Sequence, residues 1–169
     1  MSGAEAAFVI GLISGVISIG VISIVDAIKT VYDAAQDAKG QPDAFRQVAA
    51  RLPLVIKILE SAKARAQSLD ETAQEALEPT LKSCKVKAET LQEIFHKVVR
   101  KDDDKWYDRY KKAVKGALGK QSRVEGLMEG ILKDVYLLVS EKLMGTATEA
   151  EVEEIKETMK EMKDMPSSL

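Results

Sequence analysis

Apolar side chains recur at helical spacing along most of the chain. Between residues 43 and 67 the pattern continues straight through Pro53, which predicts one kinked helix. A capping box, Ser68-x-x-Glu71, opens the next helix. The apolar positions are Phe45, Val48, Ala49, Leu52, Val55, Ile56, Leu59 and Ala62 in the first helix and Leu77, Leu81, Cys84, Ala88, Leu91, Phe95 and Val98 in the second. Stripes of this kind are typical of helices packed in a bundle.

Three further helices follow, each with its own start signal. A run of aspartates precedes a short helix over 105–118. Ser122-x-x-Glu125 opens a helix that ends at Gly145, and Thr148-x-x-Glu151 opens the last one. Between turns, no segment alternates apolar and polar residues with a period of two. The pattern therefore predicts an all-α fold, a helical bundle of about five to six helices with a long, apolar N-terminal helix.

The charge pattern divides the chain into two parts. Residues 1–145 hold the predicted bundle, whereas residues 146–169 carry a net charge of −4 and one narrow apolar stripe at Val152, Ile155, Met159 and Met162. We therefore expect a bundle domain over 1–145. The acidic C-terminal helix over 146–169 would be the most loosely attached element and would serve as a connector.

Residues 6–25 contain no ionisable side chain. About 20 residues at ~1.5 Å each cover the roughly 30 Å core of a bilayer, and helical spacing continues to a stop signal at Gly40. Two interpretations stay open, a buried core helix and a helix that inserts into lipid. The candidate membrane-inserting residues are Phe8, Ile10, Leu12, Ile13, Val16, Ile17, Val21 and Ile24. The candidate helix-packing residues, small or hydroxylated, are Gly11, Ser14, Gly15 and Ser18.

Composition excludes several functional classes. With 25 Lys plus Arg against 27 Asp plus Glu, the net charge of −2 gives no general attraction for nucleic acid. One cysteine, Cys84, cannot form an internal disulfide, and one histidine, His96, cannot build a histidine-based metal centre. We expect neither an enzyme nor a bound cofactor, because no nucleophile–base pair or metal-ligand set can be assembled.

A basic segment with interleaved aromatic residues is the second candidate site. Its proposed lipid-headgroup residues are Lys105, Trp106, Arg109, Lys111, Lys112 and Lys115. Cationic and aromatic side chains together suit the headgroup region of an anionic membrane. The alternative is that Trp106 packs into the bundle and the lysines are simply solvated.

Several segments, in order, carry a family resemblance: GLISGVISI, DAIKTVYDAAQDAKGQPDAFRQVAARLPLV, SCKVKAETLQEIFHKV, W-x-x-R-Y-K-K-A-V from Trp106 to Val114, and VEGLMEGILKDVYLL. Over roughly residues 5–140 the chain resembles the SesA-type domain, the HeLo-like N-terminal module of fungal NOD-like receptors, where it precedes a NACHT or NB-ARC P-loop NTPase. The resemblance implies a HeLo-like helical bundle. It also implies a role in heterokaryon incompatibility and innate immunity.

The resemblance implies programmed cell death as the output. The expected mechanism is a homo-oligomer that permeabilises the plasma membrane through the N-terminal helix, the module being cytoplasmic at rest and at the plasma membrane on activation. Expected partners are anionic membrane lipids after activation and an NTPase-containing receptor, in cis or in trans. The alternative is a soluble helical adaptor that signals by homotypic helix–helix association without touching lipid.

Overall fold

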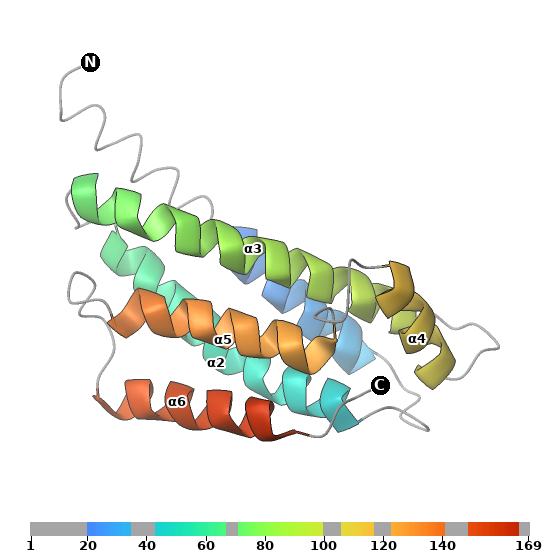
Figure 1. Ribbon diagram of the computed structural model, residues 1–169. Helices are drawn as coiled ribbons and strands as arrows, with labels where there is room; N and C mark the ends of the chain where they lie inside the picture. Colours follow the sequence, from blue (N-terminus) through green and yellow to red (C-terminus); the bar gives the residue numbers. More distant parts are fainter. Residues whose placement is uncertain are drawn as a thin grey trace, which may run out of the picture.

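The computed structural model describes residues 20–34, 43–66, 71–99, 106–116, 123–140 and 149–165, and every regular element within these ranges is a helix. The all-α fold is therefore confirmed. Residues 20–34 form the first helix, shown in blue in Figure 1. The others are α2 (Asp43–Ala66), α3 (Glu71–Val99), α4 (Trp106–Gly116), α5 (Val124–Ser140) and α6 (Glu149–Asp164). Of the long N-terminal helix expected from the sequence, the part up to residue 19 lies outside the described residues.

Helix α5 lies at the centre of the bundle, because it packs against α2, α3 and α6, while α4 packs against α3 (Figure 1). Its composition explains this position. Apolar side chains face more than one side of α5, and a helix that is apolar around most of its circumference is stable only when neighbours cover it. Its buried apolar residues are Val124, Leu127, Met128, Ile131, Leu132, Val135 and Leu138.

The apolar stripes of α2 and α3 are buried as predicted. All seven predicted positions of α3 belong to the core, from Leu77 to Val98. In α2 the predicted stripe is also in the core, except that Ile56 is half-buried and nothing is described of the Ala62 side chain. Each of the two helices contains an exposed proline, Pro53 in α2 and Pro79 in α3. The sequence pattern missed Ala44 and Ile58, which are buried as well.

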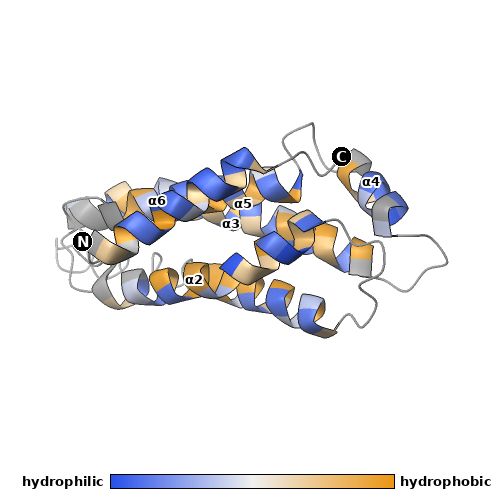
Figure 2. Cartoon of the chain, turned by 90° about the horizontal axis from the view of Figure 1, so that it is seen from below, coloured by the Kyte–Doolittle hydropathy of each residue, from blue (hydrophilic) through white to orange (hydrophobic). Residues whose placement is uncertain are grey.

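Helix α6 docks by its predicted stripe. Ile155 and Met162 are buried in the common core, and Val152 and Met159 are half-buried against it. The outer surface of α6 is mostly hydrophilic, as Figure 2 shows. The division of the chain at residue 145 stays a prediction. Outside the described residues lie the predicted capping residues Ser68, Ser122 and Thr148 and the predicted stop signals Gly40 and Gly145.

Candidate membrane and partner surface

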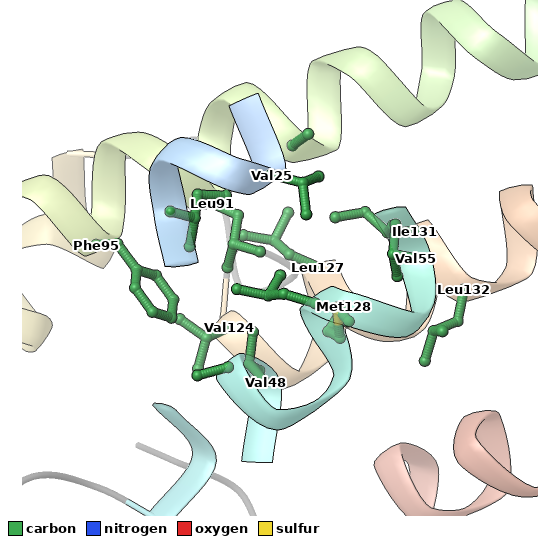
Figure 3. Packing of buried hydrophobic residues seen from close by; sticks show 14 of the residues in the cluster. Val25, Val48, Val55, Leu91, Phe95, Val124, Leu127, Met128, Ile131 and Leu132 are labelled. Atoms are coloured by element: carbon green, nitrogen blue, oxygen red, sulfur yellow. The ribbon is translucent and has the colours of Figure 1, made fainter. Parts of the chain in front are cut away.

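The helix over 20–34 contributes one face to the core. Val21, Val25 and Ile28 are fully buried, and they follow one another at the spacing of a helical stripe. Figure 3 shows Val25 directed into the same core as Leu91 of α3 and Val55 of α2. The opposite face is exposed and polar, with Ser23, Asp26, Thr30 and Asp33. In this conformation the end of the uncharged segment is thus core material.

An aromatic cluster joins this helix to three others. The Tyr32 ring lies 6.2 Å from the ring of Phe95 in α3. Phe45 of α2 stands at the centre of the cluster, with its ring 5.0 Å from Phe95, 5.6 Å from Trp106 and 4.8 Å from Tyr110. Tilted and edge-on pairs at these distances add to the stabilisation from burial. The cluster therefore couples the position of the first helix to that of the basic helix α4.

Helix α4 divides its aromatic and cationic side chains between two faces. Trp106, Tyr110 and Ala113 are buried, and the Tyr110 hydroxyl accepts a hydrogen bond of 3.0 Å from the backbone N–H of Val124 at the start of α5. Lys111 and Lys112 are exposed on the other side. Arg109 lies between, where its Nε donates to the carbonyl of Val98 at 2.7 Å and its guanidinium lies 5.6 Å from the Trp106 ring centre.

This geometry separates the predicted headgroup residues. Trp106 is a core residue here and does not face solvent, as the alternative interpretation of the basic segment expected. Lys111 and Lys112 are exposed, whereas Arg109 contacts the Val98 carbonyl of α3 and the Trp106 ring. Lys105 lies outside the described residues, as does the side chain of Lys115.

Two of the predicted membrane-inserting residues fall in the described part of the chain. Val21 is buried and Ile24 is half-buried. Outside it lie the candidates Phe8, Ile10, Leu12, Ile13, Val16 and Ile17 and the helix-packing residues Gly11, Ser14, Gly15 and Ser18. Among the helices that the structure describes, none is both long enough and apolar enough to cross a membrane.

The structure also reveals an ion pair between a half-buried lysine and a buried aspartate that the sequence analysis missed. Lys87 Nζ of α3 lies 2.8 Å from Asp134 Oδ2 of α5 and 3.0 Å from Ser83 Oγ. Gly130 leaves room for the lysine, because a Cβ at that position would lie 3.0 Å from Lys87 Cδ. The available signal was Asp134 itself, a charge within the apolar run GILKDVYLLV. The pair satisfies both charges at the α3–α5 contact.

The single cysteine is buried beside this ion pair. Burial raises the pKa of the Cys84 thiol to about 12, and the negative charge of Asp134 acts in the same direction, while Lys87 opposes it. The thiol is therefore protonated and unreactive at neutral pH, as its place on the apolar stripe of α3 suggested. In the described part of the chain, no group of three or more His, Cys, Asp or Glu side chains is placed to hold a metal ion.

The comparisons with known proteins cover four of the five segments that carried the resemblance, and the segment GLISGVISI lies outside the match except for its last residue. No curated protein and no solved structure matches the chain. Residues 19–138, or 120 of the 169 residues, match the SesA family, described as an N-terminal domain on NACHT NTPases and P-loop NTPases. The matched range begins at the first described helix and ends within α5, so it leaves α6 outside. The chain belongs to the SesA family and is an effector or signalling domain of the kind found at the N-terminus of NTPase receptors.

Proposed function

We propose that this SesA domain is a cell-death effector that oligomerises and permeabilises the plasma membrane through its N-terminal segment. The observation that carries the proposal is the uncharged stretch over residues 6–25, whose end docks on the bundle through Val21 and Val25. Membership of a family found on NACHT and P-loop NTPases supports a receptor NTPase, in cis or in trans, as the partner that controls it.

The energetics of the first helix favour a switch between two apolar surroundings. Burial of Val21, Val25 and Ile28 contributes roughly 1.5–3 kcal/mol for each side chain, so release into water costs roughly 5–9 kcal/mol. Acyl chains or a neighbouring subunit would shield the same side chains and offset this cost. The helix therefore stays docked in the resting domain, and it leaves only where lipid or another copy of the chain replaces the core.

The exposed lysines of α4 suit the second stage of this mechanism. Lys111 and Lys112 lie on the outer face of α4, and each lysine near an anionic lipid surface contributes about 1 kcal/mol to binding. In the proposed mechanism the domain is cytoplasmic at rest and is drawn to the inner leaflet of the plasma membrane on activation. There the uncharged segment inserts.

Vesicle leakage tests the proposal on the full chain. We expect Ile17→Glu to reduce dye release from anionic vesicles by about 100-fold, because a carboxylate at the centre of an inserted helix costs about 2.5–3.5 kcal/mol. Deletion of residues 1–19 should abolish release. This deletion keeps the buried Val21 and Val25 in place, so the bundle retains its core.

A matched control places the same charge on the first helix outside the uncharged segment. Thr30 is exposed, and Thr30→Glu should leave leakage within about twofold of the original chain. Far-UV circular dichroism checks that all variants remain helical. Undiminished leakage by a folded Ile17→Glu chain would exclude insertion of this segment.

The burial of Val21, Val25, Ile28 and Trp106 favours a second candidate, a soluble adaptor that signals by helix–helix association. In that case the residues singled out as membrane-inserting serve only the core. Cell killing separates the two functions. An adaptor would kill normally with Ile17→Glu and without vesicle leakage, whereas the membrane effector would lose both activities together.

A further inference from the structure

Helix α6 is held on the bundle by a compact set of side chains. Ile155, Thr158 and Met162 are buried at successive turns of one stripe, and α5 supplies the surface beneath them (Figure 1). Lys156 Nζ lies 5.9 Å from the ring centre of Tyr136 on α5. The remaining face is exposed and rich in acidic residues, which are Glu153, Glu154, Glu157, Glu161 and Asp164. The α5 surface is therefore a seat for an acidic amphipathic helix.

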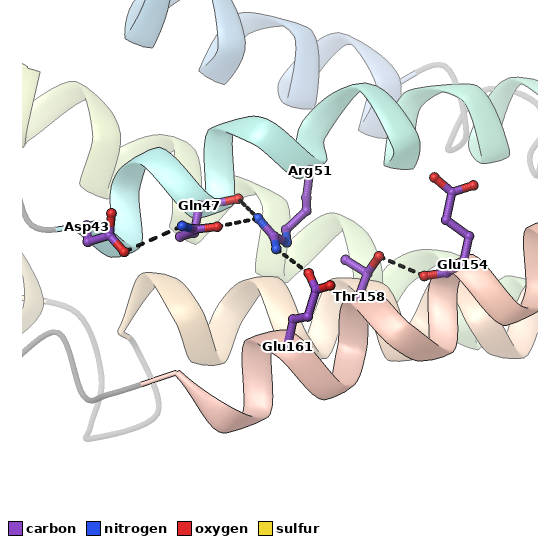
Figure 4. Close-up of polar contacts among 6 residues, drawn as sticks. All are labelled: Asp43, Gln47, Arg51, Glu154, Thr158 and Glu161. Atoms are coloured by element: carbon purple, nitrogen blue, oxygen red, sulfur yellow. Dashed lines mark hydrogen bonds and ion pairs between the residues drawn. The ribbon is translucent and has the colours of Figure 1, made fainter.

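Two polar side chains of α6, those of Thr158 and Glu161, differ in where their partners lie. The Thr158 hydroxyl is satisfied within its own helix, where it donates to the Glu154 carbonyl at 2.7 Å. Glu161, in contrast, pairs with the guanidinium of Arg51 on α2 (Figure 4). When α6 leaves, Arg51 loses its ion pair and keeps only its hydrogen bonds within α2. A replacing helix that brings a carboxylate to this position restores the ion pair.

Arg51 is positioned for this contact by its own helix. Its second terminal nitrogen donates to the Gln47 carbonyl at 2.9 Å and to Gln47 Oε1 at 2.7 Å, and Gln47 in turn donates to Asp43 Oδ2 at 3.5 Å (Figure 4). The Arg51 side chain is only 17% exposed. A cation held in place before the carboxylate arrives makes the seat selective for an acidic helix.

Eight residues connect α5 to α6. Helix α5 ends at Ser140 and α6 begins at Glu149, so residues 141–148 lie between them and include Gly145. Eight extended residues span up to about 28 Å. The SesA match ends at residue 138, so α6 is an addition to the part of the bundle that defines the family.

We propose that the seat formed by α5 and Arg51 is an interaction surface for a second copy of this chain, which delivers its own α6 in exchange. Each contact of the docked helix is reused between the two chains, so exchange costs little beyond bringing the copies together. At high dilution the α6 of the same chain occupies the seat, because its effective concentration is highest. Exchange becomes favourable when copies are gathered on a receptor or a membrane. Its biological role thus rests on the proposed oligomeric function.

Two charge-reversed full-length chains test the exchange. Arg51→Glu and Glu161→Arg each place like charges across the α2–α6 contact within one chain. In an equimolar mixture, exchange of α6 restores an opposite-charge pair at both seats of a dimer. Light scattering after size exclusion should therefore show a dimer in the mixture and monomers in each chain alone. A single chain that carries both substitutions restores its internal pair and should remain a monomer.

The matched control uses another glutamate of the same helix. Glu157 is exposed one turn before Glu161 and forms no ion pair with the described residues, so Glu157→Arg makes the same change in charge without touching the Arg51 ion pair. Mixed with the Arg51→Glu chain, it should give no dimer. A mixture of Arg51→Glu and Glu161→Arg chains that stays monomeric would overturn the proposal.

A peptide assay covers the case in which a charge-reversed chain fails to fold. Ile155→Glu places a charge in the buried stripe of α6 and leaves the seat on α5 and α2 unchanged. A fluorescent peptide of residues 149–164 should bind this full-length variant at least about tenfold more tightly than the original chain, whose own α6 competes. The same peptide with Glu161→Arg should lose most of this binding, and Glu157→Arg should not.

Equal binding of the peptide to both chains, or none to either, would refute a seat that α6 can leave and re-enter. These assays contain no lipid, so their failure is distinct from a failure of vesicle leakage. Loss of dimer formation with intact leakage would reject the exchange alone.

Discussion

At the scale of single residues, the buried carboxylate of Asp134 is matched to a specific partner. Asp134 interrupts the apolar side of α5, yet Lys87 reaches it from α3 through the space that Gly130 leaves open. Unpaired, either charge would be costly to bury. Cys84 lies beside this pair and has no covalent partner. Its contribution to stability therefore depends on its protonation state.

The first prediction concerns Cys84 and alkaline pH. Burial raises the folded-state pKa of this thiol from 9.0 to about 12, so below pH 9 the thiol is protonated in both states. Between pH 9 and pH 12 the unfolded chain releases the proton and the folded chain keeps it. The stabilisation that the thiol contributes is then lost at up to about 1.4 kcal/mol per pH unit.

Urea unfolding of the original chain and of Cys84→Ala measures this effect, because the two chains differ only at residue 84. The original chain should be the more stable at pH 8, and its advantage in free energy of unfolding should shrink by pH 11. An advantage that is constant across this range would show that the thiol titrates alike in the folded and unfolded chains.

At the scale of elements, the decisive feature is how each helix divides its surface. The first helix buries an apolar stripe and exposes a polar one, and α4 buries Trp106 and Tyr110 while Lys111 and Lys112 are exposed. A buried Trp106 cannot reach headgroups without movement of α4, whereas the lysines can act on the folded domain. In the proposed mechanism, Lys111 and Lys112 are therefore the side chains of α4 that first attract the domain to an anionic membrane.

The second prediction concerns this basic face. The double substitution Lys111→Glu with Lys112→Glu removes two attractive charges worth about 1 kcal/mol each, so binding to anionic vesicles should weaken about thirtyfold or more at low salt. The difference should narrow as salt is added, because added ions screen exposed charges. Vesicle co-sedimentation at two ionic strengths measures both effects.

The matched control reverses two exposed lysines on α6, Lys160→Glu with Lys163→Glu, and changes the net charge by the same amount. Binding should fall much less in this variant, because these lysines lie on an acidic helix. If the two double variants bound equally, net charge alone would govern attraction and α4 would have no special role.

At the scale of the whole molecule, the aromatic cluster links the first helix, α2, α3 and α4. Phe45 touches rings from α3 and α4, and Phe95 extends the cluster to Tyr32 of the first helix. Movement of the first helix or of α4, which both contain residues proposed to contact the membrane, thus disturbs the same cluster. Helix α6 stands apart from it, since it is attached through α5 and Arg51.

The third prediction concerns this cluster. Phe45→Leu removes the central ring of the cluster and should lower the free energy of unfolding by about 1–3 kcal/mol. Emission of Trp106, the one tryptophan of the chain, should shift to the red in the folded variant because its neighbour is lost. Val86→Ala, at a position 63% exposed on α3, should change neither quantity appreciably. A Phe45→Leu chain as stable as the Val86→Ala chain would contradict a central role for the ring.

Much of this organisation is readable from residue spacing. A stripe such as Leu77 to Val98 has one low-energy solution in water, a helix with that stripe turned inward, because burial of apolar area is largely insensitive to which neighbour provides it. The helical class, the stripes of α2, α3 and α6, and the uncharged segment follow from such local rules. The same rules predicted Cys84 as a buried thiol.

Other features depend on which helices meet, and spacing along one helix carries no information about its partners. Lys87 and Asp134 are 47 positions apart, and Arg51 and Glu161 are 110 apart, so neither pair has a local signal. Val25 was not among the candidate residues of the first helix, because its burial depends on how that helix packs against α2 and α3. The sequence pattern was compatible with Trp106 in lipid and with Trp106 in the core. The structure shows it in the core, with its ring against that of Phe45. Periodicity specifies how much apolar surface must be covered, whereas packing specifies what covers it.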